Sequence, residues 1–357
     1  MKQPLLGLVA TAFVVAVSLA FLALFDFPLF VGWVAFVMLC IVPQQVVTAV
    51  IATHPPFAPH TQPARGVVLL ATNVVAALII AAIVWVTVGE SVSPPGPIPS
   101  QYAVVVVPTT FLMAIAFGGW PFVRISRNMG KAGFMLLVVS YALTYVLFRV
   151  FFNYDFLRDT PVYLASAPDG LFNGVSALVF YVTALAGMFL LPHFDLWPLS
   201  TYPGVMKQPW LGLVWTVIAL IVGGIVMWVT VERLALDPMW VLTRITAPFI
   251  FGTIVVLNML QGSLFASWRQ PLKGLANATV AAVAGSLLAQ VYGRVDRLLV
   301  GVELPSGAPG YEYELWLVNA LLSVTFPFLI VHAAYFAFWP MAGRAAVDGE
   351  RVAAGGG

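Results

Sequence analysis

Ten long apolar runs divide the chain, and joints rich in proline or polar residues separate them. Each run approaches or exceeds the roughly 20 residues that a helix needs to cross a bilayer. None shows the sustained alternation, or the length of about ten residues, that is typical of a membrane barrel strand. We therefore predict an all-α integral membrane protein with about ten transmembrane helices. The runs cover residues 5–25, 28–53, 66–88, 102–119, 133–152, 171–192, 210–231, 238–265, 274–292 and 315–338.

A nine-residue stretch at the start of the first run returns at the start of the seventh. Residues 1–9 read MKQPLLGLV and residues 206–214 read MKQPWLGLV, so eight of nine positions are identical. Looser Gln-Pro-x-x-Gly copies stand at residues 62–66 and 270–274, each before another odd-numbered run. The first run resembles a signal sequence, but the internal copy indicates that it is a retained helix.

Several even-numbered runs end in a second mark, Trp-Pro, at residues 120–121, 197–198 and 339–340. We interpret the repeating unit as a helical hairpin that begins at Gln-Pro and returns near Trp-Pro. Residues 128–133 are a candidate fifth start motif, which would make five hairpins. The spacing of the marks predicts a parallel pseudo-repeat of 4 + 2 + 4 spans. Its parts are a first four-span repeat (1–119), a central hairpin (120–205), a second four-span repeat (206–341) and a disordered cytoplasmic tail (342–357).

Composition and charge support a membrane protein and fix an expected orientation. The chain is 61% hydrophobic and 8% charged, whereas soluble domains carry about 25% charged residues. Ten of the sixteen lysines and arginines fall in alternate joints that include both ends of the chain, and eleven of the fourteen acids lie elsewhere. Because basic joints stay in the cytoplasm, we predict an N-in/C-in protein of the plasma (inner) membrane. The net charge of +2 gives no reason to expect a nucleic-acid partner.

Polar residues of the eighth run are candidates for lining a solute path. Arg244 and Asn258 are fourteen residues apart, so a regular helix would place them on one face, with Gln261 beside them. Polar groups within a membrane usually face the bundle interior or a water-filled path. Two interpretations stay open. In the first, Arg244 lines the path and attracts an anion or pairs with a gating acid. In the second, Arg244 extends outward to Asp237 or Glu232, and the amides of Asn258 and Gln261 bond neighbouring helices.

A second group of candidates follows two prolines inside even-numbered runs. Gln44 and Gln45 come directly after Pro43, and Thr109 comes after Pro108. A proline frees a carbonyl in the preceding turn, and a nearby side chain can bond it. Because adjacent helical residues point about 100° apart, we expect one of the two glutamines to face a cavity or a partner helix.

Arg149 and His332 complete the candidate path residues. Arg149 lies near the end of the fifth run, where we expect its side chain to extend toward Asp155 or Asp159. His332 is the one histidine placed well inside a run. A haem held by two histidines would need a second one in the membrane, so we predict no haem.

Other chemistry is weakly represented. His54, His60 and His193 match no ligand spacing, so we expect surface positions for them and predict no metal site or cofactor. Residues 155–159 resemble the acid pairs that hold magnesium around diphosphates, but a second acid cluster is missing. The single cysteine, Cys40, excludes an intrachain disulfide framework. The chain lacks H-E-x-x-H, a Gly-rich phosphate loop and G-x-S-x-G, which argues against an enzyme.

These patterns favour a permease or channel-like carrier for a small solute, with anions among the candidates. Its path would be lined by the kinked even-numbered helices. The alternative is a non-transporting subunit that anchors or assembles a larger redox or biosynthetic membrane complex, which the scarcity of buried charge favours. The expected partners are the lipid bilayer and either a small solute or other membrane subunits.

Overall fold

The computed structural model describes residues 1–51 and 60–342 of the chain. This part contains ten helices long and apolar enough to cross a membrane, which confirms the prediction of a multi-pass helical membrane protein. We number these spans in chain order. Their bounds are Leu5–Leu22, Phe27–Ala49, Ala64–Thr87, Pro97–Ala116, Met129–Phe151, Gly174–His193, Trp210–Arg233, Pro238–Met259, Leu272–Val300 and Glu312–Tyr335.

Five spans are single α-helices and five change pitch along their length. The single helices are α1 (Leu5–Leu22), α4 (Ala64–Thr87), α7 (Met129–Phe151), α8 (Gly174–His193) and α12 (Leu272–Val300). Span 2 joins α2 (Phe27–Leu29), η1 (Phe30–Val34) and α3 (Ala35–Ile51). Span 4 joins α5 (Pro97–Phe111) and η2 (Leu112–Ala116), and span 7 joins α9 (Trp210–Met227) and η5 (Trp228–Arg233).

Spans 8 and 10 each contain four segments. Span 8 joins α10 (Pro238–Val241), η6 (Leu242–Thr246), α11 (Ala247–Ile254) and η7 (Val255–Met259). Span 10 joins α13 (Glu312–Val318), η9 (Asn319–Thr325), α14 (Phe326–Ile330) and η10 (Val331–Tyr335). Short elements occupy the joints, namely α6 (Phe122–Ile125), η3 (Asp155–Leu157), η4 (Leu199–Thr201), η8 (Ser263–Phe265) and the two-stranded parallel pair β1 (Phe152–Asn153) and β2 (Phe172–Asn173).

The π-helical turns η2, η6 and η9 of spans 4, 8 and 10 lie close to a proline, whereas η1 of span 2 ends nine residues before Pro43. Pro43 and Pro108 lie inside α3 and α5, and Pro248 and Pro327 lie in the first turns of α11 and α14. A proline has no N–H for the i→i−4 ladder, and its ring displaces the preceding carbonyl. A π-turn accommodates such a break by bonding i to i+5, which inserts one residue into the helix. Residues on the two sides of a π-turn therefore depart from the 3.6-residue spacing.

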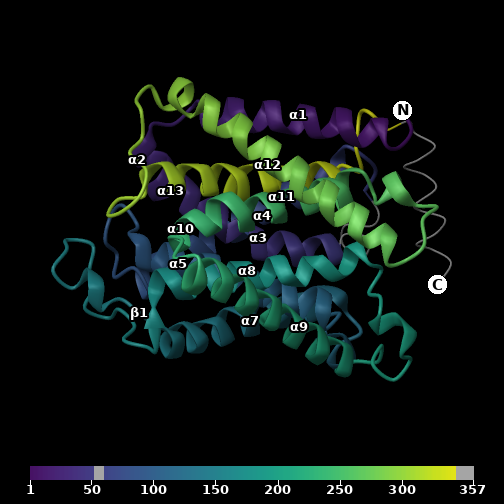
Figure 1. Ribbon diagram of the computed structural model, residues 1–357, viewed down its shortest axis with the longest axis horizontal. Coiled ribbons are helices and arrows are strands. Elements are labelled where there is room, and N and C mark those ends of the chain that lie inside the picture. The colour runs from purple at the N-terminus through teal and green to yellow at the C-terminus, as the bar shows by residue number, and fades with distance from the viewer. Residues whose placement is uncertain (52–59, 343–357) are drawn as a thin grey trace.

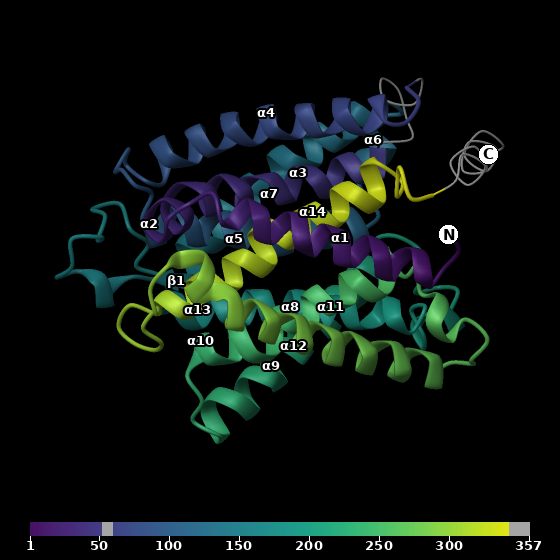
Figure 2. The ribbon, with the colours of Figure 1, turned by 90° about the horizontal axis from the view of Figure 1, so that it is seen from above.

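The even-numbered spans form the inside of the bundle and the odd-numbered spans the outside. Within an 18-residue apolar window of each span, between 56% and 72% of the residues are buried in the even spans, against 22% to 39% in the odd spans. The even spans contact one another in the cyclic order 2, 4, 6, 8, 10 and back to 2. The odd spans lie over the grooves between them, so that span 3 contacts spans 2 and 10, and span 7 contacts spans 4 and 6. In Figure 2, α4 and α9 accordingly lie on opposite sides, with α5, α8 and α14 between them.

Each Gln-Pro-x-x-Gly motif fastens the start of an odd span to the end of an even span. The glutamine Nε2 donates to a main-chain carbonyl of the even span. The glutamine Oε1 accepts from the N–H of the glycine four residues on, at 3.0 to 3.3 Å. The cross-span bonds run from Gln3 to Met259 (2.9 Å), Gln62 to Tyr335 (2.5 Å), Gln208 to Ala116 (2.8 Å) and Gln270 to His193 (3.5 Å). We call this arrangement the Gln–Gly joint.

The glycine of the joint lets the two helices approach closely. A Cβ on Gly212 would lie 2.3 Å from the ring of Phe117, and one on Gly7 would lie 2.2 Å from the carbonyl oxygen of Met259. The even spans end beside these contacts in two consecutive residues of left-handed conformation. These pairs are Gly118–Gly119, Asp195–Leu196, Gln261–Gly262 and Ala337–Phe338. Odd starts and even ends therefore meet at one end of the bundle, the end at which α1 begins in Figure 1.

Three details differ from the sequence-based boundaries. α12 continues to Val300. Its 29 residues span about 44 Å, so Arg294 and Arg297 can lie beyond a hydrocarbon core of about 30 Å. Span 8 ends at Met259, before Gln261. The candidate fifth start motif makes no Gln–Gly joint. Asn128 instead caps α7 by accepting from the Lys131 N–H at 3.0 Å.

The Gln–Gly joint predicts that Gln208→Met lowers stability, because the thioether fills the space without the donor or the acceptor. Leaving the Ala116 carbonyl and the Gly212 N–H unpaired should cost about 1–3 kcal/mol of the free energy of unfolding. Thermal unfolding of the purified protein in detergent measures the loss. Gln261→Met, at an exposed glutamine with no side-chain hydrogen bond in the described residues, is the matched control. Equal melting temperatures for the two variants would contradict a structural role for the joint.

Candidate functional site

A cavity of about 380 Å³ lies inside the ring of even spans, toward the end of the bundle that carries the Gln–Gly joints. Every even span contributes to its wall, and no residue of an odd span is among those that line it. One lining residue from each even span is Gln45, Phe111, Phe189, Asn258 and Phe326. We call this space the axial cavity. It is the place in the described structure where the five inner helices face a common space.

Aromatic rings from three even spans close together at the axial cavity. The ring centroid of Phe111 lies 5.1 Å from that of Phe189 and 6.1 Å from that of Phe326, both in edge-on geometry. This arrangement is favoured between aromatic side chains. Because these rings come from spans 4, 6 and 10, their contact fills the interior of the ring at that level.

The polar groups near the axial cavity are neutral. Gln45 Nε2 donates to the carbonyl of Pro327 at 3.3 Å, and its Oε1 has no partner among the described residues. Thr253 Oγ1 lies 3.0 Å from His193 Nε2, which joins spans 8 and 6. No lysine, arginine, aspartate or glutamate lines the cavity. Amide and hydroxyl dipoles, without fixed charge, therefore define its electrostatics.

The structure separates Arg244 from Asn258. Asn258 lines the axial cavity, whereas Arg244 is exposed and its guanidinium carbon lies 5.4 Å from the ring centroid of Tyr313. The prediction of one shared face assumed a regular helix, but η6 and η7 place π-turns at the two residues. Each inserted residue rotates the following side chains by about 100°. Arg244 therefore points outward, and its nearest recorded aromatic partner is on span 10.

The remaining even-span candidates take different places. Gln45 lines the axial cavity, and Gln44 beside it is buried with neither amide atom hydrogen-bonded in the described structure. Thr109 is buried, donates to the Val105 carbonyl at 3.2 Å, and lines a cavity on the side of the bundle. Gln261 is exposed, just beyond the end of span 8. Of the predicted path residues, only Gln45 and Asn258 therefore line the axial cavity.

Arg149 ties the outer joint to the bundle. Its Nη1 donates to the Ser166 carbonyl at 2.6 Å, and no ion pair to Asp155 or Asp159 is recorded among the described residues. The Ser166 N–H donates to Glu90 at 2.7 Å, and hydrogen bonds from Ser166 hold the pKa of the Glu90 carboxyl below its ordinary value. Arg149 therefore extends to the joint, as expected, but with a carbonyl as its partner.

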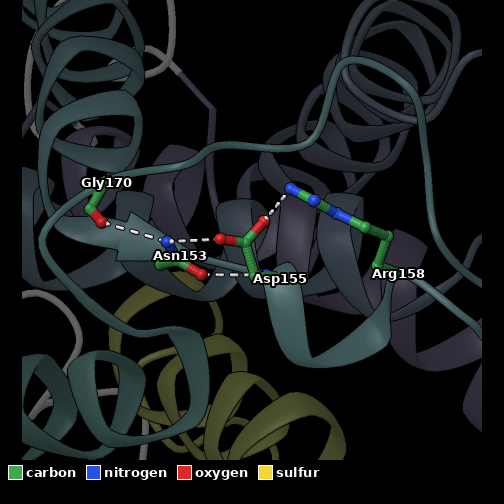
Figure 3. Close-up of polar contacts among 4 residues, drawn as sticks. All are labelled: Asn153, Asp155, Arg158 and Gly170. Carbon is green, nitrogen blue, oxygen red and sulfur yellow. Dashed lines mark hydrogen bonds and ion pairs between the residues drawn. The ribbon is translucent and has the colours of Figure 1, made fainter.

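Asp155, one acid of the outer joint, is paired with neighbouring side chains. Figure 3 shows Asp155 between Asn153 and Arg158, with the Arg158 Nη2 2.6 Å from the Asp155 Oδ1. Asn153 also donates to the Gly170 carbonyl at 3.3 Å. Asp155 therefore organises the turn by pairing with Arg158.

The histidines do not assemble. His193 is fully buried at the end of α8, contrary to the surface position expected for it, because span 8 packs against it through Thr253. His60 is exposed, and His54 lies outside the described residues. Within residues 1–51 and 60–342, no group of three His, Cys, Asp or Glu side chains could hold a metal ion.

Two lateral cavities were missed by sequence reasoning. One of about 650 Å³ is walled mainly by spans 4 to 7, and one of about 390 Å³ by spans 1, 2, 3 and 10. His332 lines the smaller one. A sequence signal did exist. Pro108 and Phe117 are nine residues apart, as are Pro327 and Phe336, and each pair lines one of the cavities.

Comparisons with known proteins gave no match. No family model, curated protein or solved structure matches the chain. The axial cavity and its lining residues are therefore the observation on which a function can be proposed.

Proposed function

We propose that the protein is a carrier or channel that moves a small solute along the axis of the inner ring. The observation that supports this proposal is the axial cavity, whose wall is built from all five even spans. Substrate sites of membrane carriers lie inside the bundle, at interrupted helices. Prolines and π-turns interrupt spans 2, 4, 8 and 10, which form most of this wall.

The lining favours a neutral or anionic solute over a cation. No carboxylate faces the axial cavity, so a cation would lose its hydration without a fixed opposite charge. The amide of Asn258 carries two N–H donors, whereas the Thr253 hydroxyl is already paired with His193 Nε2. A small polar molecule or anion would use those donors, while Phe111, Phe189 and Phe326 would limit its passage.

We also infer the finer architecture from the same repeated contacts. The Gln–Gly joint recurs at spans 1, 3, 7 and 9, which supports an origin from duplicated hairpins within the 4 + 2 + 4 arrangement. Lys2, Arg65, Lys207, Arg269 and Lys273 lie at or beside these joints. That end of the bundle would face the cytoplasm of a plasma membrane.

Transport along the axis predicts opposite effects for two lining residues. In proteoliposomes, Asn258→Ala should lower solute flux roughly tenfold, the factor expected for losing one hydrogen bond of about 1.4 kcal/mol. Phe111→Ala should raise flux, because it removes a ring from the aromatic contact. Nitrate, chloride, formate, glycerol and urea are suitable probes. Their flux is followed by trapped indicator dyes for the anions and by light scattering for the neutral solutes.

Thr279→Ala is the control for these variants, since Thr279 is exposed on outer span 9 and bonds its own helix. It should transport like the unaltered protein. Equal flux for Asn258→Ala, Phe111→Ala and the control would count against an axial path. Co-purification with fixed partner subunits, without flux of any probe, would favour the anchoring role instead.

The inferred orientation predicts which joints an antibody can reach in intact cells. A short epitope inserted after Pro161, in the joint between spans 5 and 6, should be detected from outside. The same epitope inserted after Gly204, between spans 6 and 7, should be detected only after permeabilisation. Detection after Gly204 but not after Pro161 in intact cells would contradict the inferred orientation, because the two joints lie at opposite ends of the bundle.

A further inference from the structure

The smaller lateral cavity opens toward the bilayer. It lies over span 10, between the outer spans 1 and 3, and is separate from the axial cavity. Phe13, Val17 and Val74 on the two outer spans line it and are also exposed on the outside of the bundle. Its volume of about 390 Å³ is within the range of small-molecule sites. A ligand could therefore enter this cavity from the lipid phase.

Two buried polar side chains interrupt this apolar wall. His332 is only 7% exposed, and its Nε2 has no hydrogen-bond partner among the described residues. Gln45 is 1% exposed, and its Oε1 likewise lacks a partner there. Leaving a buried polar group unpaired costs about 1–3 kcal/mol. A ligand that carries both an acceptor and a donor would remove that cost at both atoms.

The larger lateral cavity provides an internal comparison. It lies over span 4 at the positions that match those of span 10. Pro108, Leu112, Met113 and Phe117 have the same spacing as Pro327, Val331, His332 and Phe336. Met113 takes the place of His332, and its sulfur accepts from Ser140 Oγ at 3.3 Å. The Met113 sulfur therefore has a hydrogen-bond partner within the protein, whereas the His332 Nε2 has none among the described residues.

Aromatic side chains shape the His332 cavity for a flat ring. The imidazole lies 5.7 Å from the ring of Phe13 and 5.8 Å from that of Phe338, measured between centroids. Phe21, Phe328 and Phe336 add further aromatic wall. The two contacts hold the imidazole ring in place, and the aromatic wall can make offset or edge-on contacts with a planar guest.

We propose that this cavity binds a lipid-soluble quinol, with its ring against the phenylalanine side chains and its hydroxyl groups at His332 and Gln45. One quinol hydroxyl oxygen accepts from an imidazole N–H, and the other quinol hydroxyl donates to the Gln45 amide oxygen. The isoprenoid tail extends past Val17 and Val74 into the bilayer. The site does not depend on transport along the axis, although Gln45 lines both cavities.

The test titrates the purified full chain, in detergent and without oxygen, with the reduced (quinol) form of a ubiquinone analogue that has a short saturated tail. Equilibrium dialysis measures binding and thermal unfolding measures stabilisation. The unaltered protein should bind saturably at one site. His332→Met, which reproduces the residue of the larger cavity, should raise the Kd about tenfold, the effect of one lost hydrogen bond. Val17→Trp, at the exposed mouth, should block binding without altering the core.

Met113→Leu in the larger lateral cavity is the control and should bind like the unaltered protein. Uptake that rises linearly without saturation, as in plain micelles, would overturn the proposal. If His332→Met and Val17→Trp both bind the ligand with the same Kd as the unaltered protein, the ligand lies elsewhere, which would also overturn the proposal. Displacement of the quinol by an equimolar long-chain fatty acid would show that the cavity selects a carboxylate lipid, which contradicts the assigned class.

Discussion

The hydrogen bond from a Gln-Pro glutamine to the end of an even span is the contact on which the bundle depends. Lipid tails are as apolar as leucine, so apolar burial supplies little force for joining helices in a membrane. Close approach at small residues and interhelical hydrogen bonds must supply it instead. The Gln–Gly joint provides both in five residues, and it does so at four odd spans. The bonds join span 1 to span 8, span 3 to span 10, span 7 to span 4 and span 9 to span 6.

This pairing explains why the inner helices can be irregular. Each is held between outer helices, and spans 4, 6, 8 and 10 are also fixed at their ends. The breaks at Pro108, Pro248 and Pro327 are buried, as a helix interruption in a membrane requires. The same breaks turn polar side chains such as Asn258 toward the interior. A rigid outer layer and an interrupted inner layer together produce a cavity on the axis and shallower cavities at the side.

Much of this fold could be predicted from the chain. The apolar runs gave ten spans, and the repeated letters marked the starts of the odd ones. The motif could not reveal its partner, because Gln208 reaches Ala116 across 92 positions of sequence. The face of Arg244 was mispredicted, since π-turns are invisible to a 3.6-residue count. His193 was expected at the surface because it lies in a joint just beyond a predicted run, but packing of span 8 buries it.

The proposed path along the axis of the inner ring is tested most directly by asking whether water reaches the axial cavity. Replacing Cys40, the one cysteine, with serine gives a background for single cysteines at Asn258, Ala334 and Ile79. The first two line the axial cavity from spans 8 and 10, and Ile79 faces outward on span 3. A charged thiol reagent should modify Asn258→Cys and Ala334→Cys in membranes and leave Ile79→Cys unmodified. Protection of both cavity positions, with or without reaction at Ile79→Cys, would contradict a water-accessible path along the axis of the inner ring.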